Sequence, residues 1–166
     1  CTRTGSCPGA IGLVQTIATI CTGNICRSPT AAGALQLLAP GRDIFSAGLH
    51  ALVGHSMDAD SLAAARYFGI APSQHVAQQL TAELGAKADI LLVMENDHRR
   101  EIGQRWPHLM GKTFLLGHFE GGKQILDPYK KGSMMHFHMA EQVLDSVRRR
   151  VSELGGNDGA RNARGT

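Results

Sequence analysis

The sequence has no cysteine over most of its length. All four cysteines lie within the first 26 of its 166 residues, so no disulfide framework spans the fold. No apolar run reaches the roughly 20 residues that a membrane-spanning helix needs. The apolar run at 10–20 lacks a basic segment before it, so it is not typical of a secretory signal. We therefore expect no membrane insertion and a reducing compartment, the cytoplasm.

The charge balance is small, at a formal +3, and this excess is too weak to indicate a nucleic-acid partner. The chain is 43% hydrophobic and 19% charged, which is typical of a globular protein rather than a disordered one. The three consecutive arginines at 148–150 are interpreted as the solvated end of a helix, where positive charge complements the helix dipole. Composition therefore predicts one globular domain.

Strand and helix signals alternate along the chain. Apolar runs predict strands, and the periodic segments between them predict helices, of which Asn96 is expected to cap the third. The expected strands are 14–20, 44–47, 90–94 and 113–116, and the expected helices are 29–38, 58–68, 96–105 and 133–154. This alternation predicts an α/β fold, a single three-layer domain with a four-stranded parallel sheet flanked by helices. Ligands of such folds bind at the carboxyl ends of the strands.

The two ends of the chain differ from this pattern in composition. Residues 1–13 are rich in glycine and without periodicity, and we interpret them as a disordered extension or a cloning remnant. Residues 155–166 are rich in Gly, Asn and Arg, which predicts a flexible tail. The expected domain therefore covers 14–154.

The segment Cys21-Thr22-Gly23-Asn24-Ile25-Cys26-Arg27-Ser28-Pro29 follows the first predicted strand and opens the first predicted helix. A loop of this length can curl round one tetrahedral anion, with its N–H groups directed inward. The helix N-terminus adds positive partial charge. The same field favours a thiolate over a thiol. The segment therefore predicts a nucleophile and a phosphate-binding loop together.

Each residue type in this loop suits one part of phosphoryl transfer. Cys21 is the candidate nucleophile, and Arg27 can hold two phosphoryl oxygens with its planar guanidinium. The hydroxyl of Ser28 can donate a hydrogen bond to the Cys21 sulfur. Gly23 and Asn24 suit left-handed backbone geometry. The candidate phosphate-binding amides belong to Thr22, Gly23, Asn24, Ile25, Cys26, Arg27 and Ser28.

The second cysteine of the loop leaves two interpretations open. Cys26 can form a reversible disulfide with Cys21 that protects the nucleophile from over-oxidation, or it can pack as a small apolar residue. Zinc binding through the two cysteines is disfavoured, because no further cysteine and no histidine near in sequence completes a ligand set.

The loop resembles the signature of low-molecular-weight protein tyrosine phosphatases. The resemblance covers residues 14–152 and includes Ser46-Ala47-Gly48, His75-Val76-Ala77, Met94-Glu95 and Asp127-Pro128-Tyr129. The segment 46–54 is similar to a bacterial subgroup that partners tyrosine autokinases controlling capsule or exopolysaccharide export.

The resemblance implies hydrolysis of phosphotyrosine proteins by a monomer, through a cysteinyl-phosphate intermediate, with release of inorganic phosphate and without metal or cofactor. It implies that Asp127 is the general acid and then the general base, and that Tyr129 forms one wall of the substrate cleft. It also implies another cleft wall from Leu49 and Leu52, and a loop held by Asn24, Ser46 and His75.

Two positions depart from the family pattern. Ala32 stands where many relatives have Glu, and Gln78 stands where many have Arg. Both lie outside the expected catalytic set, so we expect altered packing or charge pairing rather than lost chemistry.

Two alternative functions share this loop. Arsenate reductases of the same fold need downstream cysteines to resolve their adduct, and this chain has none after Cys26. A non-catalytic phosphotyrosine-binding module is expected to have lost the nucleophile or the acid, and both Cys21 and Asp127 are present. The sequence therefore favours the phosphatase over either alternative.

Overall fold

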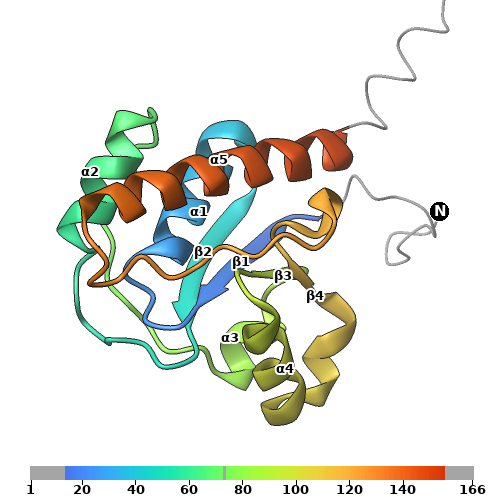
Figure 1. Cartoon of the computed structure of the whole chain (residues 1–166). Helices are drawn as coiled ribbons and strands as arrows, with labels where there is room; N and C mark the ends of the chain where they lie inside the picture. Colours follow the sequence, from blue (N-terminus) through green and yellow to red (C-terminus); the bar gives the residue numbers. More distant parts are fainter. Residues whose placement is uncertain (1–13, 73, 156–166) are drawn as a thin grey trace, which may run out of the picture.

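The computed structural model describes residues 14–72 and 74–155, which form a four-stranded parallel sheet with helices on both faces (Figure 1). The predicted extension at 1–13 lies outside the described residues, as does the predicted tail from 156 onward. The strand order is β2-β1-β3-β4, with β1 at Thr16–Cys21, β2 at Asp43–Gly48, β3 at Ile90–Val93 and β4 at Thr113–Leu115. The predicted α/β fold is confirmed.

The helices form two layers. In Figure 1, α1, α2 and α5 cover one face of the sheet, while α3 and α4 cover the other. The helical elements are α1 at Arg27–Leu38, α2 at Ala59–Tyr67, α3 at Ala82–Ala86, α4 at Asn96–Arg105, α5 at Ser133–Gly155, and the short 3-10 helices η2 at Pro107–Lys112 and η3 at His118–Glu120. Within the described ranges, no helix combines the length and the apolar character that crossing a membrane requires.

The central strand β1 supplies both halves of the core. Successive strand side chains point to opposite faces, so Ile17 and Cys21 join the cluster under α1 and α5, while Ala18 and Ile20 join the cluster under α4. Ile17, Ala18 and Ile20 are all fully buried. The same alternation directs the Cys21 side chain toward the α1 face at the carboxyl end of β1.

Several predicted boundaries are wrong by one or a few residues. The first strand ends at Cys21 rather than at residue 20, and α5 extends to Gly155, which the prediction assigned to the tail. Glu95, not Asn96, is the N-cap of α4, and its backbone N–H donates to Nδ1 of His98 at 3.2 Å. This cap uses a Glu and a His, so the usual preference for Asn at this position misplaced the start.

The predicted solvated arginine run is correct for two of its three members. Arg148 and Arg149 are exposed on α5, whereas Arg150 is only 4% exposed. Its guanidinium carbon lies 4.7 Å from the ring centroid of Phe119, and Nη2 donates to the backbone oxygen of Leu115 at 2.7 Å. Burial lowers the pKa of Arg150 to about 10. Arg150 therefore attaches α5 to the end of β4, because its position on the helix turns it toward the sheet.

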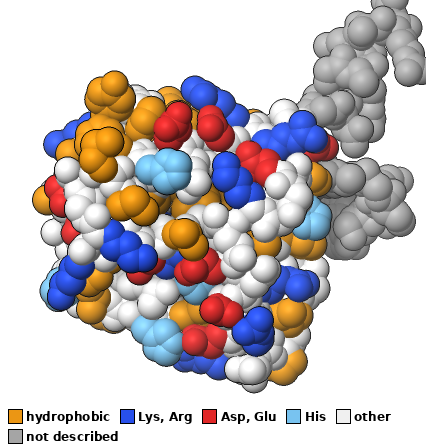
Figure 2. Space-filling view, in the orientation of Figure 1, with side chains coloured by type: hydrophobic (Ala, Val, Ile, Leu, Met, Phe, Trp, Pro, Cys, Tyr) orange, Lys and Arg blue, Asp and Glu red, His pale blue; other side chains and the backbone are white. Residues whose placement is uncertain are grey.

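The surface on the side shown in Figure 2 mixes charges of both signs. Basic and acidic side chains are interspersed there, and hydrophobic side chains gather over α2 and the start of α5. Tyr67 on α2 and Met134 on α5 are 74% and 79% exposed. This face therefore carries no field of a single sign that would steer a highly charged polymer.

Candidate active site

The loop between β1 and α1 has its carbonyl groups turned away from its centre. The carbonyls of Cys21, Thr22 and Gly23 accept hydrogen bonds from backbone amides of the segment 49–52, at 3.0, 3.0 and 3.1 Å. In a planar trans peptide the C=O of one residue and the N–H of the next point in opposite directions. The amides of the following residues therefore face the inside of the loop, as an anion site requires.

The next two carbonyls of the loop follow the same rule. The Asn24 oxygen lies 2.5 Å from Nε2 of His75, and the Ile25 oxygen accepts from the Asp58 N–H at 2.9 Å. The structure thus brings His75 against the loop, as the family resemblance implied. Five consecutive outward carbonyls leave a row of inward amides that continues into the N-terminus of α1, where the helix dipole adds positive potential.

Asn24 is the buried centre that holds this loop. Its φ is +58°, a left-handed conformation that Asn tolerates better than most residues. Its Nδ2 donates to the hydroxyl oxygens of Ser28 at 2.8 Å and Ser46 at 2.9 Å, and its Oδ1 accepts from the Gln78 N–H at 2.9 Å. The side chain therefore connects the loop, β2 and the segment after α2.

The two glycines near the loop have different reasons to be there. Gly23 does not adopt positive φ, so the prediction of left-handed geometry is wrong for it and holds for Asn24 alone. Gly48, at the end of β2, lies so close to the loop that a Cβ would come within 2.5 Å of the Thr22 oxygen. A side chain at Gly48 would push the loop away, because a Cβ does not approach a backbone oxygen that closely.

Cys21 and Ser28 face each other inside the loop. The Cys21 Sγ lies 2.9 Å from the Ser28 Oγ and 3.3 Å from the Asn24 N–H nitrogen. Since Asn24 Nδ2 donates to the Ser28 oxygen, the hydroxyl hydrogen of Ser28 remains available for the sulfur. The expected Ser28–Cys21 contact is thus present, and the bond from Asn24 leaves the Ser28 hydroxyl hydrogen available to point to the sulfur.

Arg27 is held by residues from the start of α4 and from the loop before α5. It is 2% exposed, and its Nη1 donates to Glu95 Oε2 at 2.6 Å and to the Ile125 oxygen at 2.8 Å. Its Nη2 lies 3.7 Å from Asp127 Oδ2 and 3.4 Å from Thr22 Oγ1. These contacts fix the guanidinium plane beneath the loop, so Arg27 needs little reorganisation to meet an anion.

His98 is a second buried group beside this arginine. Burial, with a smaller effect of the Arg27 charge, lowers the pKa of His98 to about 4, so the ring is neutral at pH 7. Nδ1 accepts the Glu95 N–H, and Nε2 therefore carries the proton and donates to Thr22 Oγ1 at 2.9 Å. His98 thus orients the Thr22 side chain at the edge of the loop.

A cleft of about 180 Å³ opens above the loop. It is lined by Cys21, Thr22, Gly23, Ile25, Cys26, Arg27, His50, Leu52, Asp127 and Tyr129. Leu49 is not among them, so its expected place in the cleft wall is wrong: it is 2% exposed and packs with the core under α4. The turn that follows β2 buries the Leu49 side chain and leaves His50 and Leu52 at the cleft.

Asp127 lies on the loop before α5, at the rim of this cleft. Its Oδ1 accepts the Tyr129 N–H at 3.1 Å across Pro128, and 44% of the Asp127 side chain is exposed. Proline fixes the local backbone and disfavours a helical conformation before it. The turn therefore presents the carboxylate and the Tyr129 ring to the same opening.

Cys26 is buried at the N-cap of α1, within the core cluster under α1 and α5. Burial is the main cause that raises its pKa to about 12, while a hydrogen bond with Ser61 acts in the opposite direction. Both Cys21 and Cys26 are free thiols in this structure. The packing role left open by the sequence is thus observed, and the disulfide stays a prediction.

Comparison with known proteins identifies the family to which a chain with this loop belongs. The family described as low molecular weight phosphotyrosine protein phosphatase matches residues 16–159. The chain belongs to this family. It is a protein-tyrosine-phosphatase by that membership, and the phosphatase match extends beyond the predicted domain end at 154.

Individual relatives agree with the family assignment. The phosphatase is 44% identical over 119 residues to a probable low molecular weight protein-tyrosine-phosphatase, AmsI, of Erwinia amylovora, covering 72% of this chain and 83% of that protein. The crystal structure of the tyrosine phosphatase Wzb from Escherichia coli K30 in complex with sulphate matches with a TM-score of 0.83 and 36% identity. The match covers 86% of this chain and 100% of that chain. The structure of the YwlE arginine phosphatase from Geobacillus stearothermophilus matches with a TM-score of 0.80 and 29% identity. The match covers 86% of this chain and 94% of that chain.

Sequence reasoning missed several residues that hold the site. Glu95 and His98 come from the start of α4, just after β3, and the backbone amide of Gln78 comes from a segment 54 positions away from Asn24. Met94-Glu95 belongs to the family pattern, which implies no role for either residue. Its place directly after a buried strand, at the carboxyl edge of the sheet, was the available signal.

Proposed function

We propose that Cys21 is the nucleophile of a two-step phosphotyrosine hydrolysis. Its thiolate attacks phosphorus, a sulfur–phosphorus bond forms, and the bond from phosphorus to the tyrosine oxygen breaks. Asp127 gives its proton to the departing phenolate. The outward carbonyls of residues 21–25 carry this proposal, because they oblige the loop amides to face the phosphoryl oxygens.

The second step returns the enzyme to its starting state. Asp127, now ionised, takes a proton from a water molecule that attacks phosphorus, and the sulfur–phosphorus bond breaks. Inorganic phosphate leaves, and the Cys21 thiolate is regenerated beside the Ser28 hydroxyl, 2.9 Å away. Arg27 and the amides of residues 22–28 bind the phosphoryl oxygens in both steps. The residues of one chain supply all these roles, which supports a monomer that needs no metal or cofactor for the reaction.

The lining of the cleft supports an aromatic substrate. Tyr129 and Leu52 both line the cleft with Cys21 and present apolar surface to it, and Ile25 adds to this surface from the loop. A phenyl ring is well accommodated by such walls. A phosphoarginine side chain would bring a guanidinium that needs anionic partners, and Asp127 is the one acidic residue among those lining this cleft. We therefore assign phosphotyrosine rather than phosphoarginine as the preferred substrate.

The physiological partner belongs to the same proposal. The similarity of the segment 46–54 to the bacterial capsule and exopolysaccharide subgroup supports a bacterial tyrosine autokinase as the phosphoprotein substrate. The two free thiols in the site support a reducing cytoplasmic location, since the Cys21 nucleophile must stay reduced to act.

Leaving-group dependence tests the assigned roles. Para-nitrophenol leaves without much help from an acid, whereas tyrosine does not. Asp127→Asn should therefore lower kcat on a phosphotyrosine peptide by about 10²-fold or more, and lower it much less on para-nitrophenyl phosphate. Cys21→Ser should abolish turnover of both substrates under reducing conditions with chelator present.

The matched control is Asp97→Asn, which changes an exposed aspartate on α4 and should leave both rates unaltered. Equal losses on both substrates in Asp127→Asn would refute its role as general acid. Faster turnover of a phosphoarginine peptide than of a phosphotyrosine peptide would overturn the substrate assignment.

A further inference from the structure

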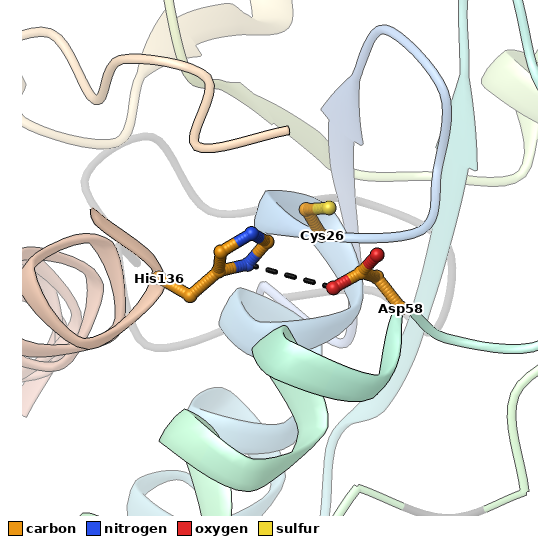
Figure 3. A group of neighbouring side chains, drawn as sticks. All are labelled: Cys26, Asp58 and His136. Atoms are coloured by element: carbon orange, nitrogen blue, oxygen red, sulfur yellow. Dashed lines mark ion pairs between the residues drawn. The ribbon is translucent and has the colours of Figure 1, made fainter. Parts of the chain in front are cut away.

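Three side chains from distant parts of the sequence converge beneath the loop. Figure 3 shows Cys26 from the loop, Asp58 from the N-cap of α2 and His136 from the first turns of α5 around one point. One donor atom from each lies within 4.8 Å of the other two. His136 Nδ1 lies 3.6 Å from Asp58 Oδ1. Sequence spacing does not predict this set, because the histidine lies 110 positions after the cysteine.

We propose that Cys26, Asp58 and His136 form a binding site for a divalent metal ion of the zinc class. A thiolate, an imidazole and a carboxylate are the three ligand types that zinc takes in proteins, and a water molecule completes a tetrahedral set. The thiolate and imidazole disfavour magnesium and calcium, which prefer oxygen ligands. On binding, the Cys26 thiol loses its proton to buffer as the sulfur–metal bond forms.

Charge and burial suit this ion. Cys26 and His136 are 4% and 2% exposed, and a quarter of the Asp58 side chain is exposed, which leaves a way in. One thiolate and one carboxylate neutralise a divalent cation, so the occupied site carries no net charge into the core. Ser61 Oγ lies 2.7 Å from His136 Nδ1 and orients the ring, so Nε2 is the ring nitrogen that we assign to the ion. Support of this kind is usual for metal-binding histidines.

Asp58 can bind a metal without losing its structural role. Its Oδ1 accepts the N–H groups of Asp60 and Ser61 at 3.0 and 3.2 Å, which caps α2. The other carboxylate oxygen is then available as a ligand. The cap fixes the carboxylate in place before any ion arrives, which reduces the cost of assembling the site.

Binding of a metal ion at this site would shift the phosphate-binding loop directly. Bonds of about 2.0–2.3 Å in a tetrahedron place ligand atoms roughly 3.6 Å apart. Any donor pair that is farther apart than this, up to the limit of 4.8 Å, would have to contract on binding, and Cys26 has its backbone amide in the loop. Displacement of a reacting geometry by about 1 Å costs up to about 10²-fold in rate. The displacement of the loop therefore predicts that the bound metal lowers turnover, a prediction that rests on the proposed function.

Cobalt spectroscopy tests the site without any turnover. The probe is Co²⁺, added to full-length protein with Cys1→Ser, Cys7→Ser and Cys21→Ser, so that Cys26 is the remaining thiol. We expect one equivalent to give a thiolate-to-cobalt charge-transfer band with intense tetrahedral absorption, and Zn²⁺ to displace it. Asp58→Asn and His136→Gln should each weaken binding by at least about tenfold. Asn can cap α2 as Asp does, and Gln can bond to Ser61, so both variants should fold.

Matched controls separate this site from binding elsewhere. Asp60→Asn and His138→Gln alter an exposed carboxylate and an exposed histidine within two positions of the proposed ligands, and should leave Co²⁺ affinity unchanged. Absence of the band refutes the site. A band that Asp58→Asn and His136→Gln leave unaltered, in variants that circular dichroism shows to be folded, also refutes it.

Inhibition of the wild-type enzyme tests the consequence. His136→Gln should raise the Zn²⁺ concentration for half-inhibition of para-nitrophenyl phosphate turnover by at least about tenfold, while His138→Gln should not. If Zn²⁺ inhibits both variants alike, it acts at Cys21, and the coupling between the metal site and the loop is wrong. Failure of the catalytic proposal would show instead as activity in Cys21→Ser, so the two failures are distinguishable.

Discussion

Arg27 and Glu95 form an ion pair in which Nη1 lies 2.6 Å from Oε2, although 68 positions separate the two residues. The arginine opens α1 and the glutamate caps α4, so the pair joins helices on opposite faces of the sheet. It places the guanidinium beneath the phosphate-binding loop before any anion arrives. Positioning a buried charge in advance in this way lowers the reorganisation needed in the transition state.

Removing this partner should cost stability. Glu95→Ala leaves the buried Arg27 charge with the Ile125 oxygen at 2.8 Å and the more distant Asp127 carboxylate at 3.7 Å, and should lower the free energy of unfolding by about 3 kcal/mol. Urea denaturation at pH 7 measures the loss. Glu101→Ala is the control, because its partners His50 and Arg105 are at the surface, and its loss should stay below about 1 kcal/mol. Equal losses for the two variants would contradict the assigned importance of the pair.

Asn24 should be the most sensitive residue that holds the loop. Asn24→Ala removes three side-chain hydrogen bonds and leaves an alanine at a φ of +58°, so we expect a loss of about 3 kcal/mol and a fall in kcat. Ser46→Ala removes one of those bonds and should cost about 1 kcal/mol. Thermal unfolding and para-nitrophenyl phosphate kinetics measure both effects. A larger loss in Ser46→Ala than in Asn24→Ala would overturn this order.

The Ser28 hydroxyl should matter more for rate than for folding. Ser28→Ala removes the hydrogen bond to the Cys21 sulfur, and since hydrogen bonds to charged groups are worth about 1.5–3 kcal/mol, we expect kcat to fall about tenfold or more. Ser28→Thr keeps a hydroxyl and serves as the conservative comparison. Unchanged kcat in Ser28→Ala would show that the loop amides alone stabilise the thiolate.

His98 should make the free energy of unfolding depend on pH in the acid range. Its pKa is lowered to about 4 in the folded protein, while an unfolded histidine protonates near 6.5. Below pH 6.5 the His98 side chain is therefore protonated in the unfolded state but not in the folded state. The free energy of unfolding falls as the pH falls toward 4. The full loss from this group is about 3 kcal/mol, and above pH 6.5 its contribution is constant.

Comparison of unfolding free energies at pH 7 and pH 4.5 checks this. His98→Asn should lose less stability between the two pH values than the wild type, because Asn does not titrate. His138→Asn, at an exposed position on the same chain, should behave as the wild type does. If the pH dependence of His98→Asn equals that of the wild type, another group is responsible.

The two departures from the family pattern should be coupled. Ala32 and Gln78 line one pocket of about 160 Å³, and the Gln78 side chain donates to the Ser46 oxygen at 2.9 Å. Ala32→Glu and Gln78→Arg should each destabilise the protein, the first by placing a carboxylate at an 8% exposed position. Together they restore the pair that many relatives have, with a coupling of about 1–2 kcal/mol in a double-mutant cycle. Additive losses would mean that the pocket does not bring the two side chains together.

Local patterns predicted much of this molecule. The alternation of apolar runs and helical periodicity predicted four parallel strands and four of the longer helices, because burial on a strand or a helix face repeats with a fixed period. Their ends were less certain, as Glu95 shows, because two adjacent residues can each supply a cap. The five-residue α3 has too few residues for a periodic signal, and it was missed.

The sequence by itself determined the chemistry of the loop. Cys21, Asn24, Arg27 and Ser28 act within eight consecutive positions, so the geometry that unites them follows from one turn between a strand and a helix. The Ser28–Cys21 contact arises within that turn, whereas the outward carbonyls are held by partners at 49–52, 58 and 75. Residues close in sequence have few ways to arrange themselves, and local physical rules are sufficient there.

The tertiary structure decided which distant residues support this chemistry. Glu95 meets Arg27, and His136 meets Cys26, because parallel strands bring their carboxyl ends to one edge and α5 packs across α1 and α2. The same packing buried Leu49 and Arg150, whose residue types alone suggested a cleft wall and a solvated end. Such contacts depend on strand order and on the rotation of each helix, and neither is recorded in the local pattern of the sequence.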